Sequence, residues 1–165
     1  MLVTFCYLTA MFGVAGYRGK VFNSTFMQQF KEEHQKDMPD SEPATGGWPD
    51  DGNGRYASKL SYVDWMNFNK RQRTHQNFVE NLPVILTVLI IGGLLLPKTT
   101  MYIGFINVGA RLLYTLLYII SGADARIIGA LASNMPINGL AIATLVFAFI
   151  SPKTCSKKDE CHADL

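Results

Sequence analysis

The stretch RTHQNFVENLP, residues 73–83, is a polar run that leads directly into the apolar run 82–96. On a helix, Arg73, Asn77 and Glu80 are spaced i, i+4 and i+7 and share one face. An arginine, an amide and a carboxylate would then project together where a helix enters lipid. Ionisable groups at that depth are costly and usually functional, and charge of both signs beside an amide suits a zwitterionic ligand. An interfacial helix end with snorkelling polar side chains is the alternative.

The apolar residues are concentrated rather than spread along the chain. The sequence has 165 residues, of which 48% are hydrophobic, and the long apolar runs are 2–17, 82–96, 101–121 and 127–150. A bilayer core needs about 20 helical residues, so the last two runs are long enough by themselves. The second becomes a full span if its helix starts near Arg73.

The first apolar run is short, and two interpretations remain open for it. It becomes a transmembrane helix if the helix continues past Arg18 and Lys20, with both side chains at the interface. A cleaved signal peptide is the alternative, although the run lacks a basic n-region and a clear small-x-small cleavage site. We predict the retained helix.

The resulting expectation is an all-α fold, a four-helix transmembrane bundle that forms one domain over residues 1–165. The helices are predicted near 2–30, 64–96, 101–121 and 127–150. Residues 37–54 are rich in Gly, Pro and Asp without periodicity and are predicted to be an irregular loop. The aromatic-rich segment after this loop suits an interfacial belt, or a flap that covers a ligand.

The distribution of Lys and Arg predicts the orientation in the membrane. Basic residues gather in the first loop, and the other side has fewer, Lys98 and three lysines of the tail; those of the first loop are Arg18, Lys20, Lys31, Lys36, Arg55, Lys59, Lys70 and Arg71. This places the long 18–72 loop in the cytosol and both termini on the far side. The net charge of +2 gives no reason to expect a nucleic-acid partner.

The three cysteines do not indicate a disulfide framework. Cys6 lies in the first apolar run and is expected to act as a small apolar residue. Cys155 and Cys161 could pair if the tail is lumenal, but their spacing does not require it. Only His162 lies near them, so no metal site is predicted.

A second polar set lies in the third apolar run. Arg111, Tyr114 and Tyr118 are spaced i, i+3 and i+7 on one helical face, and Arg126 follows just past the helix end. An arginine at that depth must point into a bundle or a cleft. Either it binds a ligand, or it pairs with a carboxylate such as Glu80 and holds helices together.

With both polar sets in view, the sequence resembles the MAPEG family, the membrane-associated proteins in eicosanoid and glutathione metabolism. The pattern is Arg73-x3-Asn77-x2-Glu80-x2-Pro83, followed by Arg111-x2-Tyr114-x3-Tyr118 and Arg126. The stretch 68–77 is most similar to the type-3 microsomal glutathione transferases. The resemblance covers roughly residues 62–150 and implies a four-helix bundle that forms a homotrimer, with glutathione bound between neighbouring subunits near the cytosolic face.

The resemblance also implies a role for each residue of the pattern. Arg73, assisted by Arg111, would hold a glutathione carboxylate, Asn77 would bind the peptide backbone, and Glu80 would pair with the ammonium. Tyr114 and Tyr118 would line the tripeptide. Arg126 would be the catalytic residue and stabilise the thiolate, which is the nucleophilic form of a thiol.

The expected function is therefore that of an integral membrane glutathione transferase or peroxidase, with glutathione as co-substrate and a lipophilic electrophile or a lipid hydroperoxide as second substrate. Membrane lipids are expected around it, in the endoplasmic reticulum or a mitochondrial membrane. The alternative is a non-catalytic, MAPEG-like accessory subunit of a larger membrane complex.

Overall fold

The described part of the chain is built from helices. In this computed structural model, residues 2–162 are described, with side chains for residues 6–150. Four long helices account for most of it: α1 (Leu2–Val21), α4 (Tyr62–Leu95), α5 (Pro97–Ser121) and α6 (Arg126–His162). Short helices lie between the first two of these: α2 (Ser24–Gln28), α3 (Lys31–Asp37), η1 (Thr45–Gly47) and η2 (Ala57–Lys59). The predicted all-α class is confirmed.

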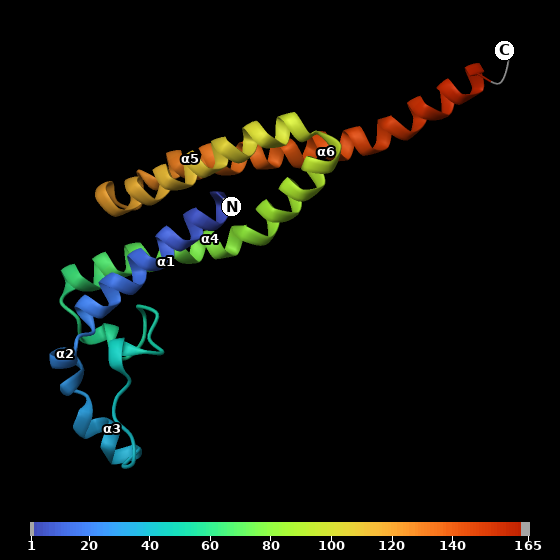
Figure 1. The fold of residues 1–165 in the computed structure, drawn as a ribbon. Coiled ribbons are helices and arrows are strands. Elements are labelled where there is room, and N and C mark those ends of the chain that lie inside the picture. The colour runs from blue at the N-terminus through green and yellow to red at the C-terminus, as the bar shows by residue number, and fades with distance from the viewer. Residues whose placement is uncertain (1, 163–165) are drawn as a thin grey trace.

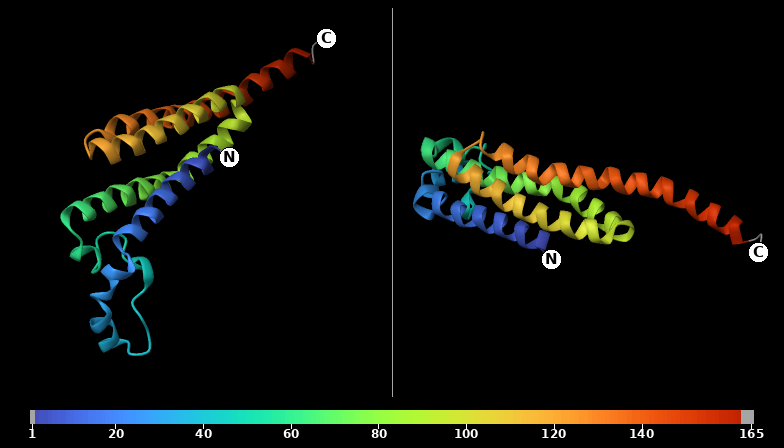
Figure 2. Two further views of the ribbon diagram at one scale, coloured as in Figure 1. Left: turned by 60° about the vertical axis from the view of Figure 1, so that its left-hand side comes forward. Right: turned by 90° about the horizontal axis from the view of Figure 1, so that it is seen from above.

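The long helices lie lengthwise beside one another. α1 packs along the first half of α4, and α5 packs on both α4 and α6 (Figure 1). Seen from above, α6 extends past the end of the other helices (Figure 2). Within the described residues, α4, α5 and residues 126–150 of α6 are long and apolar enough to cross a membrane. The chain is a multi-pass integral membrane protein.

The helix predicted for residues 2–30 is shorter in the structure, since α1 ends at Val21. Phe22 turns into an aromatic core, where its ring packs edge-on against Phe68 with centroids 5.2 Å apart. Asn23 then starts a new helix, because its side-chain oxygen accepts a hydrogen bond from the Phe26 N–H at 2.9 Å. An Asn at this position caps the free amides of α2 and separates it from α1.

The connection between α4 and α5 also differs from the prediction. The helices predicted near 64–96 and 101–121 leave residues 97–100 between them, but in the structure these residues form the first turn of α5. Proline suits this first helical turn, because it lacks the N–H that would have no partner there. Pro83 lies inside α4, where the missing N–H and the ring clash favour a kink, and α4 is bent between its two halves (Figure 1).

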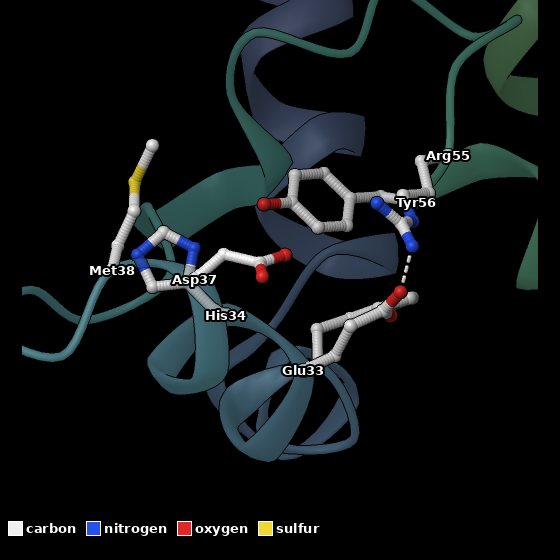
Figure 3. A pocket seen from close by; sticks show the side chains of 7 residues that line it. Glu33, His34, Asp37, Met38, Arg55 and Tyr56 are labelled. Atoms are coloured by element: carbon white, nitrogen blue, oxygen red, sulfur yellow. Dashed lines mark hydrogen bonds and ion pairs between the residues drawn. The ribbon is translucent and has the colours of Figure 1, made fainter.

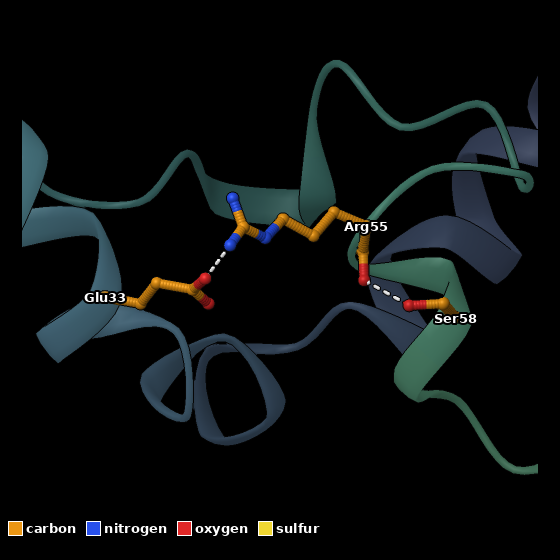
Figure 4. A network of polar contacts seen from close by, with 3 residues as sticks. All are labelled: Glu33, Arg55 and Ser58. Atoms are coloured by element: carbon orange, nitrogen blue, oxygen red, sulfur yellow. Dashed lines mark hydrogen bonds and ion pairs between the residues drawn. The ribbon is translucent and has the colours of Figure 1, made fainter.

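A lobe of residues 22–61 stands at the loop end of the bundle. Its core consists of apolar side chains from α1, the short helices and the start of α4, namely Val14, Val21, Phe22, Met27, Phe30, Ala57 and Phe68. Arg55 and Glu33 form an ion pair at the surface of this lobe, and Ser58 donates to the Arg55 carbonyl at 2.7 Å (Figure 4). Of the segment 37–54 that was predicted to be irregular, Thr45–Gly47 form η1, and these core residues all lie outside the segment.

Candidate functional site

A cavity of about 470 Å³ opens between α4, α5 and α6, near the end of the bundle that faces the lobe. Its polar lining consists of Arg73, Asn77, Glu80, Tyr114, Arg126, Asn134 and Asn138. The apolar wall comes from α6 and consists of Ile127, Ala130, Leu131 and Met135. Small-molecule sites commonly have volumes of about 300–1,000 Å³, with a few polar groups on a largely apolar wall.

The three polar residues of the sequence pattern in α4 lie together on the α4 side of the cavity. Arg73, Asn77 and Glu80 face the cavity from consecutive turns, as their helical spacing predicts. Arg73 also donates to the Gln76 side-chain oxygen at 3.4 Å. Neither Arg73 nor Glu80 forms an ion pair within the described residues. Arg73 and Glu80 therefore lie on the same side of the cavity without forming an ion pair with each other.

Arg111 has a different position from the one expected. Its side chain is 4% exposed and lies behind the cavity wall, where it donates to Asn77 Oδ1 at 2.8 Å and to Asn134 Oδ1 at 3.2 Å. Among the described side chains it makes no ion pair with Glu80 or with another carboxylate, so its helix-joining contacts there are to amides and not to a carboxylate. Arg111 joins α4, α5 and α6 through two amides, and its buried Nε has no partner within the described part of the chain.

These two hydrogen bonds fix the orientation of both amides. A guanidinium can only donate, so Asn77 and Asn134 must turn their oxygens toward Arg111. Both residues line the cavity, and the NH2 groups are the amide atoms that these two hydrogen bonds leave unused. An NH2 group is a hydrogen-bond donor, which suits peptide carbonyls or a carboxylate.

Sequence inspection missed Asn134, together with the buried pair that supports it. Asn107 and Ser133 are 1% and 0% exposed, and Asn107 Nδ2 donates to the Ser133 carbonyl at 3.1 Å and to its Oγ at 3.3 Å. The sequence did offer a signal for these three residues. Each is a polar residue within an apolar run, and such side chains must face other helices rather than lipid. Asn134 follows Ser133 directly and sits one helical position around from it.

The tyrosines and Arg126 form the end of the site nearest the loops. Tyr114 lines the cavity and is 4% exposed. Its ring lies 6.0 Å from that of Tyr118, and the Arg126 guanidinium lies 4.9 Å from the Tyr118 ring centroid, within range for a cation–π contact. Tyr118 is not among the residues that line this cavity, and its ring contacts the Arg126 side chain.

A close approach of α6 to α5 sets this geometry. A Cβ at Gly129 would lie 2.5 Å from Tyr114 Cα and 2.6 Å from its nitrogen, so no side chain fits there. Small residues at helix crossings allow backbones to come this close in membranes. The crossing places the first turn of α6, with Arg126, beside the tyrosines of α5.

Another pocket, of about 170 Å³, lies far from this site in the lobe, between α3 and residues 55–56 (Figure 3). It is lined in part by Glu33, His34 and Asp37, and His34 Nε2 is hydrogen-bonded to Ser41 Oγ at 2.9 Å. Among the side chains that the structure describes, no group of three or more His, Cys, Asp or Glu could hold a metal ion. Cys6 is buried and free, whereas Cys155 and Cys161 lie outside the described side chains.

The fold and the cavity define a class of multi-pass helical membrane proteins with a charged site at one end of the bundle. The chain belongs to the MAPEG family, whose family model matches residues 1–146. This family includes membrane glutathione transferases and peroxidases, and most of its members depend on glutathione. No curated protein matches the chain, and no solved structure matches it.

Proposed function

We propose that this protein is a membrane glutathione transferase or peroxidase that acts on lipophilic electrophiles or lipid hydroperoxides. The observation that supports it best is the joint lining of one cavity by Arg73, Asn77, Glu80, Tyr114 and Arg126. The cavity opens beside lipid-facing helices, so a water-soluble tripeptide and a membrane-dissolved partner could reach it from different sides.

The charges of the cavity match those of glutathione. Glutathione carries an ammonium, two carboxylates and two peptide groups. Glu80 would pair with the ammonium and Arg73 with a carboxylate, by charge-assisted hydrogen bonds. The NH2 groups of Asn77 and Asn134 would donate hydrogen bonds to the peptide carbonyls, because both amide oxygens are turned toward Arg111.

Arg126 would act on the sulfur. A nearby guanidinium favours the charged form of a thiol and lowers its pKa, which raises the concentration of the nucleophilic thiolate. In conjugation, the sulfur forms a bond to the electrophilic carbon, and a leaving group departs or the adduct takes up a proton. With a hydroperoxide, the sulfur attacks the terminal oxygen, the O–O bond breaks, and the alkoxide leaves and takes up a proton to become the alcohol. The resulting sulfenic acid reacts with a second glutathione to give the disulfide and water.

Isothermal titration of glutathione into the detergent-solubilised protein tests this proposal. The parent should bind glutathione, and Glu80→Gln should weaken binding by about 2–5 kcal/mol if the ion pair is desolvated. Glu32→Gln, the same change on an exposed residue of the lobe, should bind like the parent. If Glu80→Gln also binds like the parent, this cavity is not the glutathione site.

Absorbance near 240 nm, a rough general value for thiolates, then separates catalysis from mere binding. The bound tripeptide should show thiolate at neutral pH. Binding without thiolate, together with no turnover of any electrophile, would instead favour the accessory-subunit alternative.

A further inference from the structure

The last turn of α1 carries a tyrosine ring that two cations contact. The Arg71 guanidinium of α4 lies 4.2 Å from the Tyr17 ring centroid, and Lys20 Nζ lies 5.6 Å from it. Both distances are within range for cation–π contacts. α1 and α4 pack along each other at this end of the bundle (Figure 1). One ring thus brings together two positive charges from two helices.

The position of this cluster corresponds to the level of the lipid headgroups. The apolar run 2–17 ends at Tyr17, and Lys20 follows in the last turn of α1, where it is exposed. Tyrosine is enriched at the interface between hydrocarbon and water, and a lysine there extends its charge toward the headgroups. Because Arg71 contacts the Tyr17 ring, it lies at the same level.

The two cations of the cluster have no carboxylate to neutralise them. Neither Lys20 nor Arg71 forms an ion pair within the described residues. Asp64 is close by, but its oxygens accept hydrogen bonds from the Tyr17 hydroxyl at 3.4 Å and the Ser61 hydroxyl at 2.8 Å. Asp64 therefore holds the ring in place, and the cluster keeps a net positive charge.

The buried charges of the neighbouring lobe are engaged within it. Arg18 is 3% exposed and donates to the Gly46 carbonyl at 3.2 Å. Asp50 is 6% exposed, and its carboxylate accepts backbone N–H bonds from Gly52 at 2.8 Å and Ala57 at 2.7 Å. Neither residue is free to bind a ligand or to act as the missing counter-ion.

The cluster is also separate from the candidate glutathione site. Arg73 follows Arg71 by two residues, which turns it by about 200° to another face of α4, and Arg71 is not among the residues that line the glutathione cavity. Two further side chains of α4 fasten the lobe to the helix, since Trp65 Nε1 and Asn69 Nδ2 both donate to the Gly52 carbonyl, at 3.0 Å and 2.9 Å. The proposed function assigns no role to Lys20, Tyr17 or Arg71.

From these observations we propose that Lys20 and Arg71 bind the headgroup of an anionic phospholipid. Arg71 Nη1 donates to the Asn67 carbonyl at 3.0 Å, which leaves its Nη2 and Nε for two phosphate oxygens, the bidentate contact that a guanidinium favours. Lys20 would add a second positive charge beside the Tyr17 ring. Basic pockets between transmembrane helices are known to hold anionic headgroups in this way. The inference goes beyond the proposed function and does not depend on it.

Native mass spectrometry of the detergent-solubilised protein tests the inference, with phosphatidylglycerol compared with phosphatidylcholine of identical acyl chains. The parent should bind phosphatidylglycerol more tightly, because the two lipids differ in net charge and not in their tails. Lys20→Gln and Arg71→Gln should each lower the affinity for phosphatidylglycerol about fivefold, the effect of one cation near an anionic surface. Binding of phosphatidylcholine should not change. Lys98→Gln, the same change on an exposed lysine in the first turn of α5, should bind both lipids like the parent.

Thermal unfolding gives a readout that does not depend on the fold of the Arg71 variant. A ligand of the native state raises its stability, so phosphatidylglycerol should raise Tm of the parent more than phosphatidylcholine does. That difference should shrink in Lys20→Gln. Because Lys20 is exposed, this variant should have the Tm of the parent without lipid, even if Arg71→Gln is destabilised by the loss of its contact with Tyr17.

Three results would overturn the inference. One is a parent-like affinity for phosphatidylglycerol in both Lys20→Gln and Arg71→Gln. Another is a loss in Lys98→Gln as large as in Lys20→Gln, because positive charge would then act without a defined site. The third is displacement of phosphatidylglycerol by an equal concentration of glycerophosphoglycerol, its soluble headgroup, which would show that the cluster binds free anions rather than a lipid.

Discussion

At the residue scale, Arg126 is the side chain whose proposed role is most specific. It lines the cavity and lies 4.9 Å from the Tyr118 ring centroid. An interaction felt mainly by the thiolate changes the chemical step more than the binding of the thiol. Arg126→Ala should therefore bind glutathione within a few-fold of the parent and show a raised thiol pKa. Each unit of that rise should lower the thiolate fraction, and with it the rate at neutral pH, about tenfold.

The pH titration of thiolate absorbance in parent and variant checks this outcome. Arg126→Lys serves as the conservative variant and should recover part of the pKa effect, because it restores a cation without the planar guanidinium. An unchanged thiol pKa in Arg126→Ala would show that another group activates the sulfur.

Asn134 gives a second prediction at this scale. It accepts from the buried Arg111 at 3.2 Å, so Asn134→Ala removes one of the two acceptors of a desolvated guanidinium. Leaving a buried donor without a partner costs about 1–3 kcal/mol, which should appear as a lower Tm in detergent. Asn138→Ala, one turn further along α6 and exposed, should leave Tm unchanged. Equal Tm values for the two variants would show that the Arg111 hydrogen bond to Asn134 contributes no stability.

Helical spacing allowed the α4 part of the site to be predicted from sequence, since Arg73, Asn77 and Glu80 do share the cavity wall. It could not show whether Arg111 or Arg126 faces the cavity. Arg111 and Arg126 differ in burial and in their partners on other helices, and both properties depend on tertiary packing. Asn134 was missed for the same reason, because its contact with Arg111 and its place in the cavity lining both come from tertiary packing.

At the scale of elements, the crossing of α5 and α6 is fixed by Gly129. A Cβ there would overlap the backbone of Tyr114 rather than a movable side chain. Gly129→Val should push the helices apart, lower Tm and weaken glutathione binding, since Tyr114 and Arg126 both depend on this contact. Gly109→Ala in α5, where nothing lies within 4 Å of the added Cβ, should be tolerated. A parent-like Tm and affinity in Gly129→Val would show that the crossing adapts without cost.

The apolar runs predicted the long helices well, because run length and hydropathy are local properties. The end of α1 at Val21 was not predicted. It depends on the burial of Phe22 against Phe68, a contact between residues far apart in the sequence. The fold of the lobe also could not be predicted, since it depends on the satisfied carboxylate of Asp50.

At the scale of the whole molecule, we propose a homotrimer with glutathione bound at subunit boundaries. Large apolar side chains are exposed on α5 and α6, among them Phe105, Leu116, Leu131 and Leu145. Lipid covers some of these faces, and close helix packing between copies would cover others. Native mass spectrometry in detergent should show a trimer, and the glutathione site should be lost on dilution to monomers. A stable monomer that still binds glutathione would contradict both the assembly and the shared site.

The continuity of α4 has a consequence for how the chain tolerates changes of length. One unbroken helix carries the loop anchors Trp65 and Asn69, then Arg73, Asn77 and Glu80. Each residue of a helix turns the next by about 100°, so a single inserted residue between Asn69 and Arg73 would rotate the ligand face away from α6 while the loop stayed attached. Residues 38–44 are mostly exposed and carry no such register, so insertions there should preserve glutathione binding. We therefore expect insertions and deletions to be tolerated in the lobe and not in the first half of α4.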